Sequence, residues 1–336
     1  MATVRTTAHW GWLIVGVAAT YLVPHVLDRF WLGWLIETAI TVIAVLGLYF
    51  LMGLCGQISL GQAAFMGVGA YSVAILVVHF QLSYWMAIPV AMGVTGAVAI
   101  FFGIPSLRVK GFYLAIATLA AQYLITWAIT HFPLKMWTGG DDGLTVPPPR
   151  FAGFSIESYS SLCPVVITAM WLMIYFAKNI SRTKVGRALV AIRDSDLAAE
   201  LLGINVFLYK LIAFLLAGLY AGMAGALFVP YVIRIAPANF DLEKSIWQLG
   251  MLIIGGSNSV VGAVVGTVFV RLLLQVTVSY GPILHQVPYI GPPLANYCGS
   301  ILFGVVLMMF LIFEPRGLNH RWEVFKAWYR LHPFSY

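Results

Sequence analysis

Residues 178–210 read KNISRTKVGRALVAIRDSDLAAELLGINVFLYK and form a charged segment between two long apolar stretches. This charged segment holds six of the 19 Lys and Arg residues of the chain and three of its 12 acidic residues. In a chain that is otherwise nearly all apolar, we expect such a segment to lie outside the lipid and to contact something soluble. It is therefore the first guide to function.

The composition places most of the chain in a membrane. Of its 336 residues, 61% are hydrophobic and 9% are charged, whereas a soluble globular domain has roughly 25% charged residues. The net charge of +7 does not indicate nucleic-acid binding, because the basic residues lie beside apolar stretches, where they set the orientation in the bilayer. We therefore predict an all-α, polytopic membrane protein.

The number of membrane spans follows from the apolar stretches, since a spanning helix needs about 20 mostly apolar residues. A shorter apolar piece at 246–254 precedes a glycine-rich break and gives a tenth span if it crosses the membrane. With ten spans and both termini in the cytoplasm, the inside segments hold 13 Lys and Arg residues and the outside segments hold 5, as the positive-inside rule requires. The sequence predicts one transmembrane domain over 1–336, with about ten helices, some short and broken. The nine longer stretches are 10–27, 35–54, 60–79, 85–104, 112–131, 160–177, 211–231, 258–276 and 297–313.

Two connections on the opposite side of the membrane from the charged segment are rich in glycine and proline. They are 132–159, which contains the run Pro147-Pro148-Pro149, and 277–296, which has no Lys or Arg. Proline fixes φ and glycine permits turns, so we expect stiff, ordered loops. With this orientation both loops are periplasmic.

A polar, glycine-rich break interrupts the apolar stretch at 53–71 and contains Gln57, Ser59 and Gln62. Non-helical backbone at membrane depth must be buried in protein or line a water-filled path. The polar side chains are therefore candidates for the wall of a translocation path, whereas the glycines fit either that path or close helix packing. A second break, Gly255-Gly256-Ser257-Asn258, is either a plain helix turn or a turn that faces the path or a partner.

The charged segment has the pattern of one or two short amphipathic helices. Asp194 or Ser195 can cap a helix over 196–202, and Gly203 suits the position just after its end. Upstream, apolar residues recur at helical spacing at 185, 189 and 192. Such helices either lie on anionic lipid or dock on a protein. The alternation of acidic and basic residues favours docking on a protein.

Several kinds of chemistry are not indicated by the sequence. It contains no G-x-x-x-x-G-K-[ST] loop for ATP, its seven histidines lack metal-ligand spacing, and no catalytic constellation is evident. We also expect few ionisable groups deep in the predicted spans. This expectation argues against a proton- or ion-coupled pump, which needs buried carboxylates.

Six blocks of the sequence, in order along the chain, together resemble the LivM-type permeases of bacterial ABC importers for branched-chain amino acids and related solutes. The resemblance covers about 35–318. The blocks are GLCGQISLGQAAFMGVGAYSVAIL (53–76), SLRVKGFYLAIATLA (106–120), TGGDDGL (138–144), GRALVAIRDSDLAAELLGINVFLYKLIAFLLAGLYAGMAGALF (186–228), LGMLIIGGSNSVVGAVVGTVF (249–269) and LIFEPRGL (311–318).

The resemblance implies a multi-pass, non-catalytic permease of the bacterial inner membrane that binds no cofactor of its own. Its implied partners are a second, LivH-like permease subunit, two cytoplasmic ATPase subunits that bind ATP and Mg, and a periplasmic solute-binding protein. The default solutes of the family are branched-chain amino acids, and similar permeases carry urea, short amides, other amino acids or organic acids.

The resemblance also gives the charged segment a role as the coupling helix that seats in the ATPase. The general signature of such permeases is Glu-Ala-Ala-x-x-x-Gly, and residues 197–203 keep this frame with leucine in place of the leading glutamate. The candidate coupling residues are Arg187, Arg193, Asp194, Asp196, Ala198, Ala199, Glu200 and Gly203. The candidate path residues are Gln57, Ser59, Gln62, Thr118 and Gln122.

Two other functions are compatible with parts of the pattern. A stand-alone secondary carrier or channel for a small neutral or zwitterionic solute would transport without an ATPase. A structural membrane subunit without a path of its own would tolerate leucine at Gln57 and Gln62.

Overall fold

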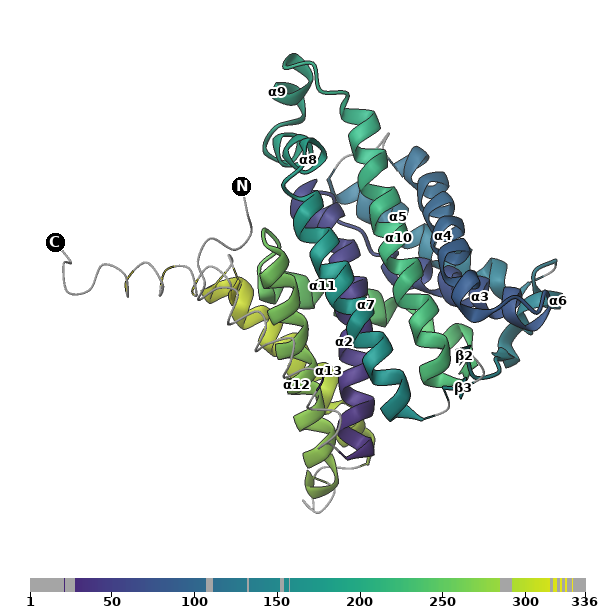
Figure 1. The fold of residues 1–336 in the computed structure, drawn as a ribbon. Helices are drawn as coiled ribbons and strands as arrows, with labels where there is room; N and C mark the ends of the chain where they lie inside the picture. Colours follow the sequence, from purple (N-terminus) through teal and green to yellow (C-terminus); the bar gives the residue numbers. More distant parts are fainter. Residues whose placement is uncertain are drawn as a thin grey trace.

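The computed structural model describes most of the chain, and what it describes is largely helical (Figure 1). The described residues are 21, 28–106, 111–131, 133–151, 154–156, 158–284, 292–314, 317, 318, 321, 324 and 328. The span expected at 10–27 lies almost entirely outside them.

Five helical segments of the described chain are long and apolar enough to cross a membrane. The first joins α2 (Arg29–Leu48) to the π-helical turn η2 (Tyr49–Leu54), and the others are α4 (Tyr84–Ser106), α5 (Phe112–Thr130), α7 (Tyr159–Ile180) and α10 (Val206–Val232). Helices α11 (Leu242–Gly255) and α12 (Val260–Leu284) form a sixth candidate, bent by 119° at the break between them. The described residues therefore support a multi-pass membrane protein without confirming the expected count of about ten spans.

The piece expected at 246–254 is part of α11. That helix has 14 residues, which is short for a full span, and the bend to α12 makes the pair a broken span or a re-entrant loop. Helix α12 continues to Leu284 and α13 (Pro292–Phe313) follows, so the connection between them is shorter than the expected loop 277–296.

Helix α10 is the centre of the bundle and packs against α2, α4 and α3 (Gln62–Val78). Close approach depends on glycine here. A methyl group on Gly69 of α3 would lie 2.6 Å from the Cα of Gly222 of α10, nearer than packed carbon atoms approach. Small residues thus let the helix backbones meet, which is how helices associate where lipid replaces water.

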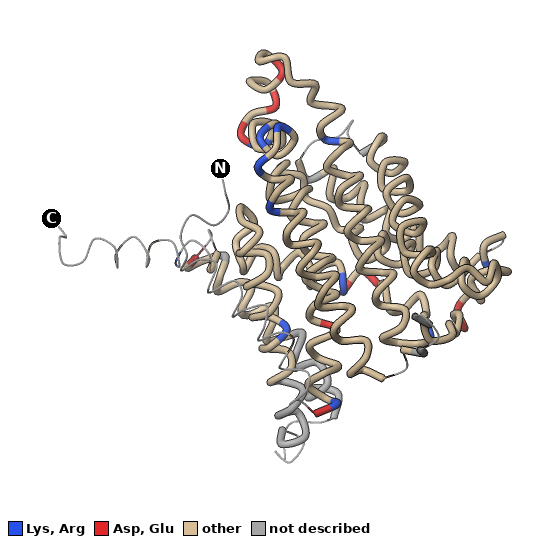
Figure 2. Tube along the Cα trace, in the orientation of Figure 1, with Lys and Arg blue, Asp and Glu red and all other residues tan. Residues whose placement is uncertain are grey.

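The charged segment forms one end of the molecule, beyond the ends of α7 and α10 (Figure 1). It folds into α8 (Lys184–Asp194) and α9 (Asp196–Leu201), and Figure 2 shows charged residues gathered on it, whereas those on the helices below are few and scattered. Two short amphipathic helices were expected in this segment, and two are present.

Short elements lie at the opposite end, within the expected ordered loop 132–159 and just after α10. They are the helical turns α6 (Lys135–Thr138) and η3 (Gly140–Asp142), the strands β1 (Leu144–Thr145), β2 (Arg150–Phe151), β3 (Phe154–Ser155) and β4 (Arg234–Ile235), and the turn η4 (Pro237–Phe240). Strand β1 pairs antiparallel with β4, and β2 pairs antiparallel with β3. The β1–β4 pair joins the expected loop to the chain that leads from α10 into α11.

Candidate functional site

Helix α9 is held in place by a cap at each end. The Ser195 hydroxyl accepts a hydrogen bond from the Ala198 amide at 3.3 Å, so Ser195 is the cap, one of the two residues expected for that role. Gly203 has a φ of +80°, and its amide donates to the Glu200 carbonyl. A left-handed residue just after a helix is where glycine is favoured, so the expected position of Gly203 is confirmed.

Arg193, at the end of α8, joins the charged segment to both glycine-rich breaks. Its Nη1 donates to the Gly53 carbonyl at 2.9 Å and to the Asn258 side-chain oxygen at 2.8 Å. We name Arg193, Gly53 and Asn258 the Arg193 clasp. Nη2 also lies 3.2 Å from the Asp194 carboxylate. Arg193 therefore links α8 directly to η2 and to the turn between α11 and α12.

The two breaks also touch each other. A methyl group on Gly53 would lie 2.1 Å from the Ser257 carbonyl oxygen, and one on Gly56 would lie 2.8 Å from the Cγ of Arg193. Glycine at position 53 therefore leaves room for the contact with Ser257, and glycine at position 56 leaves room for the Arg193 side chain. A π-helical turn such as η2 is often found at functional sites, and here it ends at the clasp.

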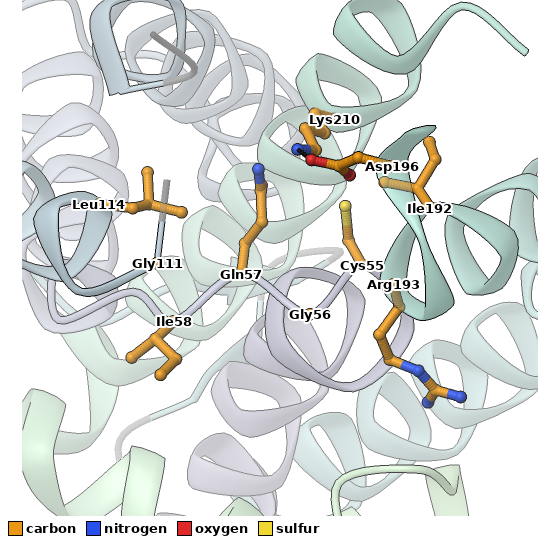
Figure 3. Close-up of a pocket in the computed structure, with 10 residues that line it drawn as sticks. All are labelled: Cys55, Gly56, Gln57, Ile58, Gly111, Leu114, Ile192, Arg193, Asp196 and Lys210. Carbon is orange, nitrogen blue, oxygen red and sulfur yellow. Dashed lines mark hydrogen bonds and ion pairs between the residues drawn. The ribbon is translucent and has the colours of Figure 1, made fainter. Parts of the chain in front are cut away.

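A cavity of about 270 Å³ opens between the charged segment and the first break (Figure 3). Gln57 and Cys55 face it from the break, and Asp196 and Lys210 form an ion pair of 2.7 Å beside it. That pair joins the start of α9 to the first turns of α10. Burial raises the pKa of the Cys55 thiol to about 12, so the thiol stays protonated and unreactive near neutral pH.

The remaining candidate coupling residues divide by exposure. Arg187, Ala198 and Glu200 are exposed, whereas Ala199 is buried against the bundle. Arg193 and Asp196, which were expected to contact the ATPase, have the partners within the chain described above. The largest apolar exposures on this end belong to leucines of the α9 region, with exposed fractions of 72% for Leu197, 81% for Leu201 and 78% for Leu202.

Four of the five candidate path residues are buried around the first turn of α3. Thr118 accepts a hydrogen bond from the Leu60 amide at 2.9 Å, and Gln122 accepts one from the Ala64 amide at 3.0 Å. Gln62 donates to the Ala44 carbonyl at 2.9 Å, and the Ser59 hydroxyl accepts from the Gly61 amide at 3.4 Å. Three of these contacts satisfy amides that the break leaves open, as a broken helix in lipid requires, and the Gln62 contact ties the start of α3 to the interior of α2. Their part in a path stays a prediction.

The sequence reasoning missed Ser245, which completes this arrangement from α11. Its hydroxyl donates to the Gln122 side-chain oxygen at 3.1 Å and accepts from the Ala63 amide at 2.9 Å. The Gln122 side-chain nitrogen donates to the Phe240 carbonyl at 2.7 Å. One glutamine on α5 thus ties α3 to η4 and α11, a link that no spacing in the sequence indicates.

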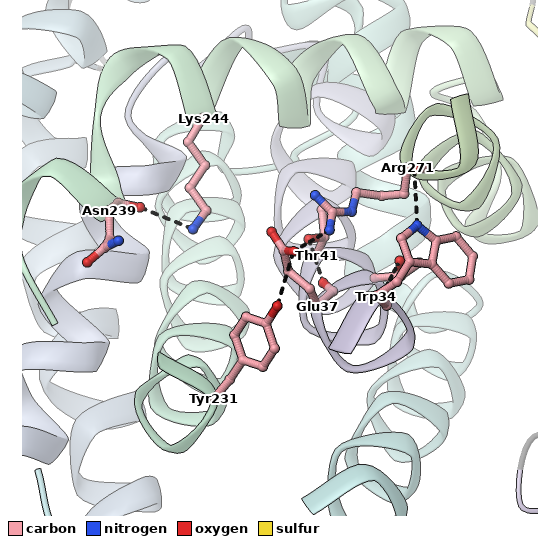
Figure 4. A network of polar contacts seen from close by, with 8 residues as sticks. Trp34, Glu37, Thr41, Tyr231, Asn239, Lys244 and Arg271 are labelled. Carbon is pink, nitrogen blue, oxygen red and sulfur yellow. Dashed lines mark hydrogen bonds and ion pairs between the residues drawn. The ribbon is translucent and has the colours of Figure 1, made fainter. Parts of the chain in front are cut away.

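A second charged group lies inside the bundle, and we name Glu37, Arg271 and Lys244 the Glu37 cluster (Figure 4). The Arg271 guanidinium forms an ion pair with the Glu37 carboxylate. Lys244 donates to the Asn239 carbonyl at 3.1 Å, and its ammonium lies 3.9 Å from the centre of the Phe228 ring. The expectation of few ionisable groups deep in the spans therefore fails at this place, and a charged residue within each of the stretches 35–54 and 258–276 was the signal for it.

Metal chemistry finds no support in the described part of the chain. His, Cys, Asp and Glu side chains there form no group of three or more that could hold an ion.

Comparison with known proteins identifies the family. The family model for the permease component of the branched-chain amino acid transport system matches residues 30–311. The chain belongs to this family. The matched region contains the Arg193 clasp, the Glu37 cluster and the whole charged segment.

Individual members of the permease family show how far the similarity extends. The high-affinity branched-chain amino acid transport system permease protein LivM of Salmonella typhimurium is 26% identical over 84% of this chain and 68% of its own length. LivM of Escherichia coli is 25% identical over the same shares. The autoinducer 2 import system permease protein LsrC of Shigella flexneri is 24% identical over 54% of this chain and 51% of its own. No solved structure gives a significant match.

Proposed function

We propose that this chain is a permease subunit of an ATP-driven importer of the bacterial inner membrane, with branched-chain amino acids or a related small polar solute as its cargo. The family match and the LivM relatives support the class of transporter. The chain itself is non-catalytic in this proposal. ATP and Mg are bound by two ATPase subunits, and a LivH-like permease and a periplasmic solute-binding protein complete the importer.

The observation that carries the proposal is that a rigidly held helix at the charged end exposes apolar side chains. Helix α9 is capped and ion-paired to α10, yet it presents Leu197, Leu201 and Leu202 outward. Exposed apolar residues rimmed by charged ones are typical of a protein interaction site, and a short helix held rigidly loses little entropy on docking. In the proposed importer these leucines enter a groove of the ATPase.

The Arg193 clasp gives the docked helices a path to the membrane. When the ATPases move α8 and α9, Arg193 pulls on the Gly53 carbonyl and on Asn258 together. Gly53 lies in the last turn before the first break and Asn258 lies in the second, and such ends of helices are where changes in chain direction are absorbed. Opening and closing of the permease would follow from this coupled movement.

The test is co-purification followed by reconstitution. The chain, expressed with its partner subunits and solubilised, is expected to purify with an ATPase and to support uptake that requires ATP. Leu197→Ser combined with Leu201→Ser is expected to release the ATPase, whereas Ile312→Ser, an exposed apolar residue far along the chain on α13, is the matched control. Transport by the chain alone, without ATP, would contradict the proposal.

The Glu37 cluster gives a specific reason to keep a stand-alone carrier as the second candidate. Intramembrane carboxylates and cations commonly belong to solute or ion pathways. A carrier predicts uptake driven by an ion gradient in liposomes that contain only this chain, so the same reconstitution separates the two functions.

A further inference from the structure

A cavity lies at each end of α5. The inner cavity is the one of about 270 Å³ beside the charged segment, and Figure 3 shows Gln57 and Leu114 on its walls. The outer cavity has a volume of about 540 Å³ and lies toward the opposite end of the same helix. The residues of α5 that line the outer cavity are Gln122, Tyr123, Thr126, Trp127 and Thr130. It therefore extends from the middle of α5 to the last residue of that helix.

The outer cavity faces water rather than lipid. Three exposed carboxylates line it, one from η3 and two from the N-terminal end of α11. They belong to Asp141, Asp241 and Glu243. Carboxylates are costly against lipid and are found instead beside water-filled spaces. Water can therefore reach the middle of α5 from the side opposite the charged segment.

Between the two cavities, α5 has one buried polar residue, Thr118. Leu114 lines the inner cavity and Gln122 lines the outer one, and these two residues are about 12 Å apart along the helix axis. Thr118 is midway between them and is buried. The three residues recur at every fourth position, so they lie along one face of the helix. Thr118 thus marks the place where a route from one cavity to the other is closed.

The first break closes that route by packing on Thr118. The Thr118 hydroxyl accepts a hydrogen bond from the Leu60 amide at 2.9 Å. A methyl group on Gly61 would lie 3.0 Å from the Thr118 carbonyl oxygen, so the two backbones are in close contact. One turn further along α5, Gln122 bonds to α3, η4 and α11 and forms a fixed floor of the outer cavity.

The segment that rests on Thr118 is also the one that the Arg193 clasp holds. Residues 55–61 lie outside the helices, between η2 and α3. Arg193 bonds to the Gly53 carbonyl just before this segment. Large changes in chain direction are absorbed by such short connections and not by helix interiors. A movement of α8 can therefore act on the contact of the break with Thr118.

We propose that the contact of Leu60 and Gly61 with Thr118 is the gate of the translocation path, closed in this structure. A solute reaches the gate through the outer cavity and leaves through the inner cavity when the clasp draws the break away from α5. The inference rests on the proposed function, since it assumes that the chain conducts a solute and that ATPases move α8. A purely structural contact would instead stay closed throughout the transport cycle.

The experiment measures how fast a thiol at the gate reacts with a water-soluble methanethiosulfonate in the complete importer. Because position 118 is buried, Thr118→Cys should react slowly at rest, and opening of the gate during ATP turnover should make it react at least about tenfold faster. Leu60→Cys, on the other side of the contact, should show the same acceleration. Mass spectrometry of the labelled peptides separates these thiols from the native cysteines.

Thr95→Cys is the matched control for burial. Thr95 is buried as well, and its hydroxyl bonds to the Ala91 carbonyl within α4. It lines neither of the two cavities. Its labelling should therefore be slow both at rest and during ATP turnover.

A methyl group placed at the contact tests the same gate without ATP. Gly61→Ala, combined with Thr118→Cys, puts the added carbon against the Thr118 carbonyl and should raise labelling at rest by about threefold or more, since overpacking moves neighbouring backbone. Gly93→Ala is the control, because nothing lies within 4 Å of the carbon that it adds. It should leave the labelling rate unchanged.

Equal labelling of Thr118→Cys and Leu60→Cys at rest and during measured ATP hydrolysis overturns the inference. Equal acceleration of Thr95→Cys also overturns it, because the whole bundle would then loosen and no gate would be distinguished. Failure of the proposed function looks different, because the wild-type complex would then show no ATP-dependent uptake of any solute.

Discussion

The Arg193 clasp and the Glu37 cluster are both built around an arginine on a helix, but they use its donors differently. In the clasp, Nη1 of Arg193 is shared between two acceptors on two other elements. In the cluster, Arg271 pairs with Glu37 and keeps a buried Nε without an acceptor, beside an unpaired Gln248 oxygen. Arg193 can therefore transmit movement from α8 to two breaks, whereas Arg271 holds α12 against α2 inside the bundle.

The largest effect is expected from breaking the clasp with Arg193→Glu. The new carboxylate would face the Gly53 carbonyl, the Asn258 oxygen and Asp194, so each attraction becomes a repulsion. Uptake should fall roughly 100-fold, since breaking a partly buried charged contact costs about 3 kcal/mol. ATP hydrolysis should continue without transport, and both rates are measured in proteoliposomes.

Lys184→Glu makes the same charge change at the exposed start of α8 and is the control. Uptake by the Arg193→Glu importer at the wild-type rate would contradict the role of the clasp. Loss of hydrolysis and uptake together would instead indicate that the ATPase no longer docks.

The Glu37 cluster is tested by removing one charge and then both. Glu37→Gln leaves Arg271 without its counter-charge and should lower the free energy of unfolding by about 3 kcal/mol. The double variant Glu37→Gln with Arg271→Gln should recover much of this loss, because two neutral amides need no pairing. Thermal unfolding in detergent measures the stability of the single and the double variants. A double variant that loses at least as much stability as Glu37→Gln and Arg271→Gln together would show that the two side chains do not act as a pair, and would contradict this assignment.

A smaller effect on stability is expected from Gln122→Leu. This change leaves the Ala64 amide, the Ser245 hydroxyl and the Phe240 carbonyl without their partner. Unpaired buried groups of this kind cost about 2 kcal/mol, which should appear as a lower unfolding temperature. Thr126→Val, one turn further along α5, removes a bond within its own helix and should have a much smaller effect.

The smallest effect concerns the reactivity of Cys55 beside the clasp. Its pKa is raised to about 12 by burial, so the thiolate that reacts with maleimide is scarce below that pH. Labelling of Cys55 should stay slow from about pH 7 to 9, a range in which an ordinary thiol with a pKa of about 8.5 becomes largely ionised. Mass spectrometry of the labelled peptide provides the readout. Fast labelling at pH 8 in the folded importer would show that the cavity is more open than in this structure.

The local features of the charged segment could be predicted from sequence because they depend on neighbours in the chain. Ser195 and Gly203 cap α9 as their residue types indicate. The partners of Arg193 could not be predicted in this way, since Gly53 and Asn258 are 140 and 65 residues away. The glycines of the sequence indicate where the two breaks lie. They do not indicate that the two breaks contact each other, as Gly53 and Ser257 do.

The polar residues of the first break show the same division. Their composition indicated that Gln57, Ser59 and Gln62 could not face lipid. Composition did not distinguish a side chain that lines a cavity from one that ties two helices together. The structure puts Gln57 at a cavity and Gln62 against the Ala44 carbonyl.

The sequence by itself determined that the chain is a multi-pass helical membrane protein with one charged segment, because apolar length and charge distribution act through the bilayer, whatever the packing. Tertiary structure alone decided which charges are paired and which remain open. Glu37 and Arg271 are isolated charges in two apolar stretches of the sequence, and only the packing of α2 against α12 makes them a pair. Pairing depends on distance in space, and a linear pattern does not contain that distance.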